Sequence, residues 1–98
     1  MRSENIDGVF TIFLKGEIDA QNANEIHEKI SELLPARGEA PLAFDAKELT
    51  YISSAGLRLI LSVQKQLGQK ISVINVSPNV MEIFQMACFQ TLMHIKGA

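Results

Sequence analysis

The sequence predicts an α/β domain in which a mixed β-sheet of four to five strands is covered by three or more helices. Short apolar or alternating segments, typical of strands, are separated by longer segments whose apolar residues recur at helical spacing. Of the 98 residues, 47% are hydrophobic, which is enough for one compact core. A chain of this length seldom divides into two domains. Residues 1–98 are therefore expected to form a single domain with the element order β-β-α-β-α-β-α-β.

The first clear strand signal lies in residues 9–14, which are rich in β-branched and aromatic side chains. This strand is expected to end at Lys15-Gly16. Residues 2–7 have a weaker pattern and are expected to form a short partner strand that ends near Asp7-Gly8. One face of the longer strand carries its large apolar side chains: Phe10, Ile12 and Leu14.

A first helix is expected after Asp19, where Asn22 and Glu25 have the spacing of a capping box. The helix should end before Pro35 and Gly38, which disfavour its continuation. Five apolar residues at helical spacing would form its buried stripe: Ala23, Ile26, Ile30, Leu33 and Leu34.

The third strand is predicted from the short apolar run 42–44, whose end at Asp45 is expected to reach the edge of the sheet. A second helix follows the pair Ser53-Ser54 and is expected to stop at Gly68. Its inward stripe is predicted to contain four residues: Leu57, Ile60, Leu61 and Leu67.

The remaining elements are a strand over residues 71–76, a third helix and a last strand over residues 92–96. Ser77-Pro78 has the residue types that favour the N-cap and the first position of a helix. The third helix is expected to turn four residues inward: Val80, Ile83, Phe84 and Ala87.

Composition excludes several functional classes. The formal net charge of −2, without a run of either sign, argues against nucleic acid or an anionic membrane as the main partner. The single cysteine, Cys88, cannot form an internal disulfide, and the charged start MRSENIDG lacks the apolar stretch of a secretory signal. The nearly apolar run 57–63 is far shorter than the roughly 20 residues of a spanning helix. We therefore expect a cytoplasmic protein that does not insert into a membrane.

Enzymatic and metal chemistry find little support. His27, His94 and Cys88 match no zinc or 2-His-1-carboxylate spacing, and the apolar context of Cys88 predicts a packed thiol. The stretch Ile52 to Gly56 lacks the first glycine of the G-x-S-x-G elbow. No phosphate-binding loop pattern occurs either. We therefore expect neither an enzyme nor a bound cofactor or metal.

The serine pair before the second helix has two compatible interpretations. One serine can cap the helix, a role worth about 1 kcal/mol. The free N–H groups and the helix dipole at the same place favour an added anion, so a phosphate on a first-turn serine could be held there. Arg58 lies four residues after Ser54 on the same helical face, where its guanidinium can reach such a phosphate.

The order of these motifs resembles a STAS domain of the anti-sigma factor antagonist type over nearly the whole chain. Residues 16–19, Gly-Glu-Ile-Asp, resemble the family's turn after the second strand, and residues 44–52 resemble its stretch into the switch loop. Ser53-Ser54-Ala55-Gly56-Leu57 is similar to the family's D-S-S-G-L or D-S-T-G-L. The register from Gly56-Leu57 places the family's phosphorylated serine on Ser54. Ser53 stands where many antagonists have aspartate, so that carboxylate is missing.

The resemblance implies a partner-switching function. The unphosphorylated protein would bind an anti-sigma factor that is also a serine kinase and so release a sigma factor. Phosphorylation of Ser54 would end the binding, and a metal-dependent serine phosphatase would reset it. The implied partner surface contains Asp19, Ser53, Ser54 and Arg58, and the protein alone is expected to be a monomer.

Two alternatives stay open. The same fold could serve as a STAS accessory subunit of a lipid-transport ABC ATPase without phosphorylation. A nucleotide-binding module is disfavoured because the chain has no phosphate loop.

Overall fold

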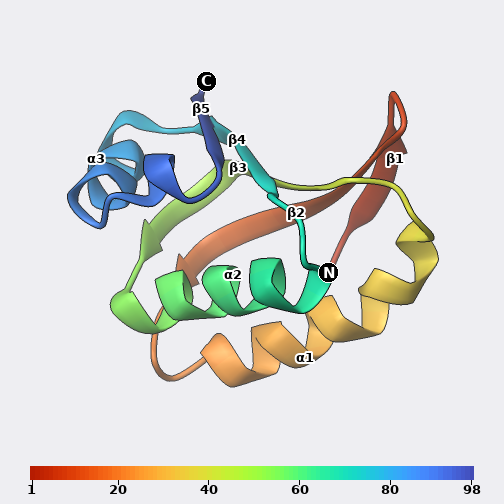
Figure 1. Ribbon diagram of the computed structural model, residues 1–98. Helices are drawn as coiled ribbons and strands as arrows, with labels where there is room; N and C mark the ends of the chain where they lie inside the picture. Colours follow the sequence, from red (N-terminus) through yellow and green to blue (C-terminus); the bar gives the residue numbers. More distant parts are fainter.

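The computed structural model describes all residues from 1 to 98 and confirms the predicted α/β class and element order (Figure 1). Five strands alternate with three α-helices and two short 3₁₀ helices. In chain order these are β1 (Ser3–Ile6), β2 (Val9–Ile18), α1 (Ala23–Leu33), η1 (Leu34–Arg37), β3 (Leu42–Ile52), α2 (Ser54–Leu67), β4 (Ser72–Val76), α3 (Pro78–Met86), η2 (Phe89–Thr91) and β5 (His94–Gly97).

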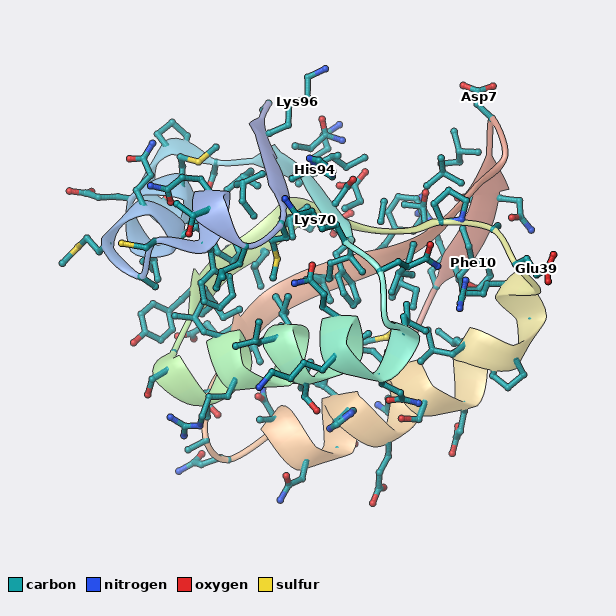
Figure 2. All side chains as sticks on the ribbon, in the orientation of Figure 1. Asp7, Phe10, Glu39, Lys70, His94 and Lys96 are labelled. Carbon is teal, nitrogen blue, oxygen red and sulfur yellow. The ribbon has the colours of Figure 1, made fainter.

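The five strands form one mixed sheet with the order β1-β2-β3-β4-β5. β1 is antiparallel to β2, and the other neighbours are parallel. The β1–β2 turn consists of Asp7 and Gly8, both with positive φ, and Figure 2 shows Asp7 at its tip. The same figure places His94 and Lys96 on β5, at the opposite edge of the sheet.

The hydrophobic core lies between the sheet and the three helices. A single cluster of 22 buried residues includes side chains from α1, α2 and α3 and the predicted inward residues of β2, namely Phe10, Ile12 and Leu14. Figure 1 shows α1 and α2 running next to one another along one side of the sheet. Residues alternate between the two faces of a strand. Phe13, which stands between the inward-facing Ile12 and Leu14, therefore faces away from the helices, and so does Asp45, its partner on β3.

Two strands are longer than the sequence patterns predict. β2 continues through Lys15-Gly16 to Ile18, since Gly16 adopts a φ of 74° and register shifts absorb the irregularity. β3 continues from Asp45 to Ile52, so Asp45 lies inside the strand and not at the sheet edge. The polar residues after Asp45 hid this continuation.

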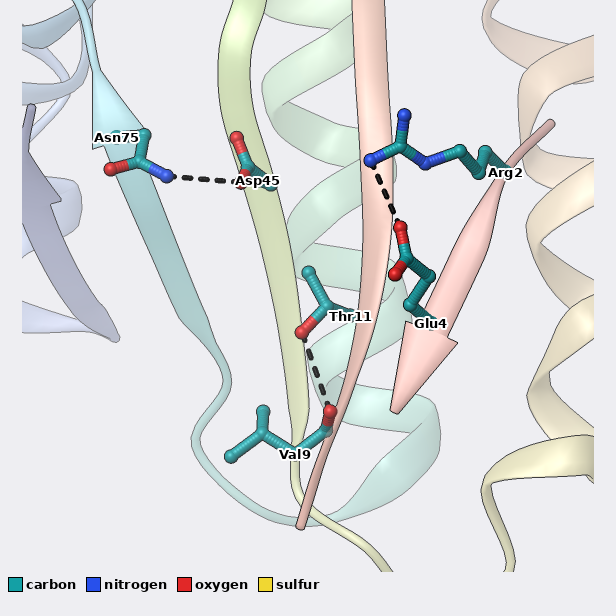
Figure 3. Close-up of polar contacts among 6 residues, drawn as sticks. All are labelled: Arg2, Glu4, Val9, Thr11, Asp45 and Asn75. Atoms are coloured by element: carbon teal, nitrogen blue, oxygen red, sulfur yellow. Dashed lines mark hydrogen bonds and ion pairs between the residues drawn. The ribbon is translucent and has the colours of Figure 1, made fainter. Parts of the chain in front are cut away.

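Asp45 is tolerated inside β3 because its carboxylate is hydrogen-bonded. It is 8% exposed, and its Oδ2 accepts a 3.0 Å bond from Asn75 Nδ2 on β4 (Figure 3). Its Oδ1 accepts a 2.9 Å bond from the Lys47 backbone N–H. Burying a polar group costs little when such partners are present.

The predicted helix signals were partly wrong. Asn22 and Glu25 do not form a capping box, because the Asn22 side chain instead bonds to the backbone of Asp19 and Glu17. Ser77 is the N-cap of α3 and Pro78 its first residue, as predicted, although the Ser77 hydroxyl donates a 2.9 Å bond to Asn79 Oδ1 and makes no capping bond to the helix backbone. The fully buried positions of α2 are Gly56, Leu59, Ile60 and Val63, whereas Leu57, Leu61 and Leu67 are half-buried. Gly68 ends α2 in the left-handed conformation, as predicted.

One residue near the C-terminus differs from expectation. Cys88 is exposed and not packed, and it adopts a φ of 58° between α3 and η2. The neighbouring Met86 is 82% exposed. Among all residues, no group of three His, Cys, Asp or Glu side chains is arranged to hold a metal ion. None of the helices combines the length and apolarity that a membrane crossing requires.

Candidate functional site at the ends of β2 and β3

β2 and β3 end at the same level of the sheet. Ile18 and Ile52, the last residues of the two strands, are paired in register. The Ser53 N–H donates a 2.8 Å bond to the Ile18 carbonyl, which extends the parallel pairing by one step. The turn that starts at Asp19 and the turn that starts at Ser53 therefore leave the sheet next to one another.

The Asp19 turn is held by bonds within itself. Asp19 Oδ1 accepts bonds of 2.9 and 3.2 Å from the N–H groups of Gln21 and Asn22. Asn22 Oδ1 accepts a 2.9 Å bond from the Asp19 N–H, and its Nδ2 donates a 2.8 Å bond to the Glu17 carbonyl. The Asp19 carboxylate thus fixes the chain between β2 and α1, as aspartate does in such turns.

Ser53 is the N-cap of α2. Its backbone is extended, with φ −88° and ψ 176°, and its Oγ accepts a 3.4 Å bond from the Gly56 N–H. Its carbonyl accepts the 2.9 Å bond from the Leu57 N–H. The capping role considered for the pair therefore belongs to Ser53.

Ser54 is the first residue of α2 and is exposed. No hydrogen bond holds its hydroxyl, in contrast to the hydroxyl of Ser53. Arg58, one helical turn further along, is also exposed and takes no part in the two ion pairs of the chain. The structure therefore places a free hydroxyl and a free guanidinium on the same end of one helix.

Gly56 is a site residue whose packing role the sequence reasoning missed. A Cβ atom at this position would lie 2.5 Å from Ile52 Cγ1 and 2.9 Å from Ile18 Cγ2. Only glycine lets the first turn of α2 lie this close to the two strand ends. Its signal in the sequence is a glycine, a poor helix former, in the first turn of an otherwise strong helix.

Comparison with known proteins identifies the family of the chain. The model of the STAS domain matches residues 1–97. The chain belongs to the STAS domain family. BtrV of Bordetella bronchiseptica, which is named as an anti-sigma factor antagonist, is 32% identical over 98 residues, and the match covers 97% of this chain and 84% of BtrV.

Solved structures share the STAS fold over nearly the whole chain. One of them is the Thermotoga maritima protein tm1081, which is named as a putative anti-sigma factor antagonist. Its TM-score is 0.83 at 14% sequence identity, and the match covers 99% of this chain and 86% of the tm1081 chain. The antagonist SpoIIAA in its unphosphorylated form has a TM-score of 0.66 at 22% identity, with coverages of 99% and 87%. SpoIIAA from Bacillus has also been solved in a phosphorylated form.

In this STAS domain, the two motifs on which the resemblance depends meet in space. Asp19 from the first motif and Ser53 from the second start adjacent turns, and Ser54 and Arg58 follow on α2. Tyr51 adds an aromatic side chain at the same end of the sheet. It is 44% exposed, pairs with Glu17 and was not singled out from the sequence, because its strand had been expected to end at Asp45.

Proposed function

We propose that this STAS domain is an anti-sigma factor antagonist controlled by phosphorylation of Ser54. The unphosphorylated protein binds an anti-sigma factor that is also a serine kinase, and a sigma factor is released. Phosphorylation ends the binding, and a metal-dependent serine phosphatase restores it. The observation that carries the proposal is the exposed Ser54 hydroxyl, which has no hydrogen bond and lies at the first residue of α2.

Ser54 is a better phosphate acceptor than Ser53. A kinase must bring the acceptor hydroxyl within reach of a nucleotide phosphate, and the exposed Ser54 requires no rearrangement for this. The Ser53 hydroxyl accepts the capping bond from the Gly56 N–H, and Ser53 itself is half-buried. Phosphorylation of Ser53 would disturb the start of α2.

A phosphate on Ser54 should be compatible with the fold. It adds a charge of about −1.5 to −2 and three acceptor oxygens at the positive end of the α2 dipole. Arg58 lies one turn away on the same helix and is free to pair with it. A partner packed against this turn must instead desolvate the new charge, which disfavours the complex.

The partner surface in this proposal is the end of the sheet where Asp19, Ser53, Ser54 and Arg58 gather. Asp19 acts there as a positioning residue, because its carboxylate is already used within its own turn. The protein alone is a monomer in this scheme. The reversal Arg58→Glu should weaken the complex with the anti-sigma factor but change the free energy of unfolding by less than about 0.5 kcal/mol, because Arg58 is exposed and unpaired. An unchanged affinity would place the interface elsewhere.

The acceptor is identified by treating wild type, Ser53→Ala and Ser54→Ala with the cognate kinase and ATP and following intact mass. We expect wild type and Ser53→Ala to gain one phosphate and Ser54→Ala to gain none. Uptake by Ser54→Ala but not by Ser53→Ala would move the site to Ser53. No uptake by wild type would contradict phosphorylation control and favour the lipid-transport accessory role.

A further inference from the structure

The charged side chains of α2 are all positive. The helix contains Arg58 and Lys65 and no acidic residue. All acidic residues of the chain except Glu82 lie in residues 1–48, so the segment 49–81 has no negative side chain. The chain as a whole has a formal net charge of −2, and α2 therefore differs in sign from the protein that carries it.

Arg58 and Lys65 lie in one row with Ser54. Lys65 follows Arg58 by seven residues, or two helical turns, so the two side chains share a face and lie about 10 Å apart along the helix axis. Both are exposed, and neither takes part in an ion pair. Ser54 begins the row one turn before Arg58. The row therefore runs from the proposed phosphate acceptor along most of α2.

An apolar row lies beside the cationic one. It contains the half-buried Leu57 and Leu61, and Gln64 continues it three residues later. Gln64 Nε2 donates a 3.0 Å bond to the Leu92 carbonyl, which holds Leu92 next to α2. Leu92 is 39% exposed. The two rows together make up the α2 face: Ser54, Leu57, Arg58, Leu61, Lys65 and Leu92.

Acidic residues border the α2 face without pairing to its cations. They lie at the end of β2, in the turn that follows it, on α1 and on α3: Glu17, Asp19, Glu25, Glu28, Glu32 and Glu82. The other acidic residues lie on β1, in the β1–β2 turn, after η1 and in β3. No ion pair joins any acidic residue to Arg58 or Lys65, and Glu25 pairs instead with Lys29 at 3.4 Å. Negative charge on α1 is thus kept apart from positive charge on the neighbouring α2 (Figure 1).

We propose that the α2 face binds an acidic surface of the anti-sigma factor, with carboxylates opposite Arg58 and Lys65 and an apolar side chain against Leu61 and Leu92. This inference rests on the proposed function and names the chemistry of the partner. Complementary charge speeds association and fixes the register of a complex. A partner surface displaced towards α1 would bring its carboxylates to the glutamates there, so the separated charges allow one docking position.

The mixed character of the α2 face favours a protein over other anionic partners. A nucleic acid gains its affinity from several phosphate contacts at once, and two cations are too few for this. A free anion would use Arg58 or Lys65 but leave the leucine row uncovered. An acidic protein surface can satisfy both rows, because interfaces combine apolar side chains at the centre with polar groups at the rim.

The proposal gives phosphorylation a second way to end binding. A phosphate on Ser54 adds about −1.5 to −2 charges to the row that holds Arg58 and Lys65. The positive charge of the α2 face is then largely cancelled, and carboxylates of the partner meet a phosphate of the same sign. The complex is therefore weakened by repulsion as well as by the desolvation of the phosphate.

The test compares two charge reversals when the cognate anti-sigma factor is titrated into the full chain. Lys65→Glu should weaken binding by about tenfold or more, and Lys65→Gln by a smaller factor. Lys96→Glu is the matched control, because Lys96 is exposed and unpaired, and Figure 2 shows it on β5, away from α2. Its affinity should stay within about twofold of wild type. The two reversals give the same net charge, so long-range attraction cannot explain a difference between them.

Salt dependence and thermal unfolding complete the test. Added salt should weaken the wild-type complex more than the Lys65→Glu complex, and thermal unfolding checks that each variant is folded. Three results would overturn the proposal and leave the proposed function intact: unchanged affinity of Lys65→Glu, an equal loss in Lys65→Glu and Lys96→Glu, or a wild-type affinity that does not fall with salt. Failure of the wild-type protein to bind the anti-sigma factor would contradict the proposed function, and this inference with it.

Discussion

The close contact between α2 and the strand ends can be tested with Gly56→Ala. Residue 56 lies in the first turn of a helix, where alanine would normally be preferred over glycine by about 1 kcal/mol. The added methyl group, however, meets Ile52 Cγ1 at 2.5 Å and Ile18 Cγ2 at 2.9 Å. Carbon atoms pack favourably at about 3.5–4.0 Å, so the site is too small for the new group.

The net effect follows from these two opposing terms. Ile18 and Ile52 are each 1% exposed and anchor the ends of β2 and β3, so neither can move away freely. Inserting a carbon into such a core costs about 1–3 kcal/mol. Because both contacts are far below the favourable distance, we expect the upper part of that range. The higher helix preference of alanine offsets about 1 kcal/mol of this cost, so the variant should be less stable than wild type by about 1–2 kcal/mol of unfolding free energy.

Urea denaturation followed by circular dichroism measures this loss. The thermal midpoint should fall by about 4–8 °C for each kcal/mol in a chain of this size. Gly97→Ala is the matched control, because its Cβ would lie 3.6 Å from Met81 Cε and 3.8 Å from the Val76 carbonyl oxygen, both ordinary contacts. The control should change stability by less than about 0.5 kcal/mol. A Gly56→Ala protein as stable as wild type would refute the close-packing argument.

Two further substitutions test particular parts of the fold. Cys88→Gly should raise the unfolding free energy by about 0.5–1 kcal/mol, because glycine adopts the φ of 58° at this position without strain and removal of the exposed Cys88 side chain sacrifices little buried surface. A drop in the thermal midpoint would contradict this. Asp45→Ala should lower the unfolding free energy by about 1–3 kcal/mol, because it leaves the Lys47 N–H and the Asn75 amide without an acceptor. An unchanged urea midpoint for Asp45→Ala would show that water replaces the carboxylate.

The fold class and the element order could be predicted because they depend on apolar periodicity. The inward residues of β2 and the glycine stop of α2 follow from that pattern and from backbone preference. The ends of β2 and β3 could not be predicted in the same way. Gly16 marks a bulge in β2 and not its end, and Asp45 is buried because Asn75, 30 residues later, supplies its partner.

The site could be predicted only in part for a similar reason. The position of Ser54 in the first turn of α2 was predicted correctly from the serine pair and the apolar segment that follows it. The division of roles within the pair depends on which hydroxyl faces the Gly56 N–H, and the three-dimensional turn decides this. The packing role of Gly56 likewise depends on strands that end far away in the sequence.

In the proposed function, a phosphate on Ser54 acts on binding and not on folding. The most direct measurement compares the unphosphorylated protein with the protein phosphorylated at Ser54, using calorimetric titration of the cognate anti-sigma factor and thermal unfolding of each form. We predict that phosphorylation lowers the affinity by about tenfold or more, while the unfolding free energy changes by less than about 1 kcal/mol. Equal affinity of the two forms would show that the phosphate on Ser54 does not control binding, and loss of affinity accompanied by unfolding would show that it acts on the fold.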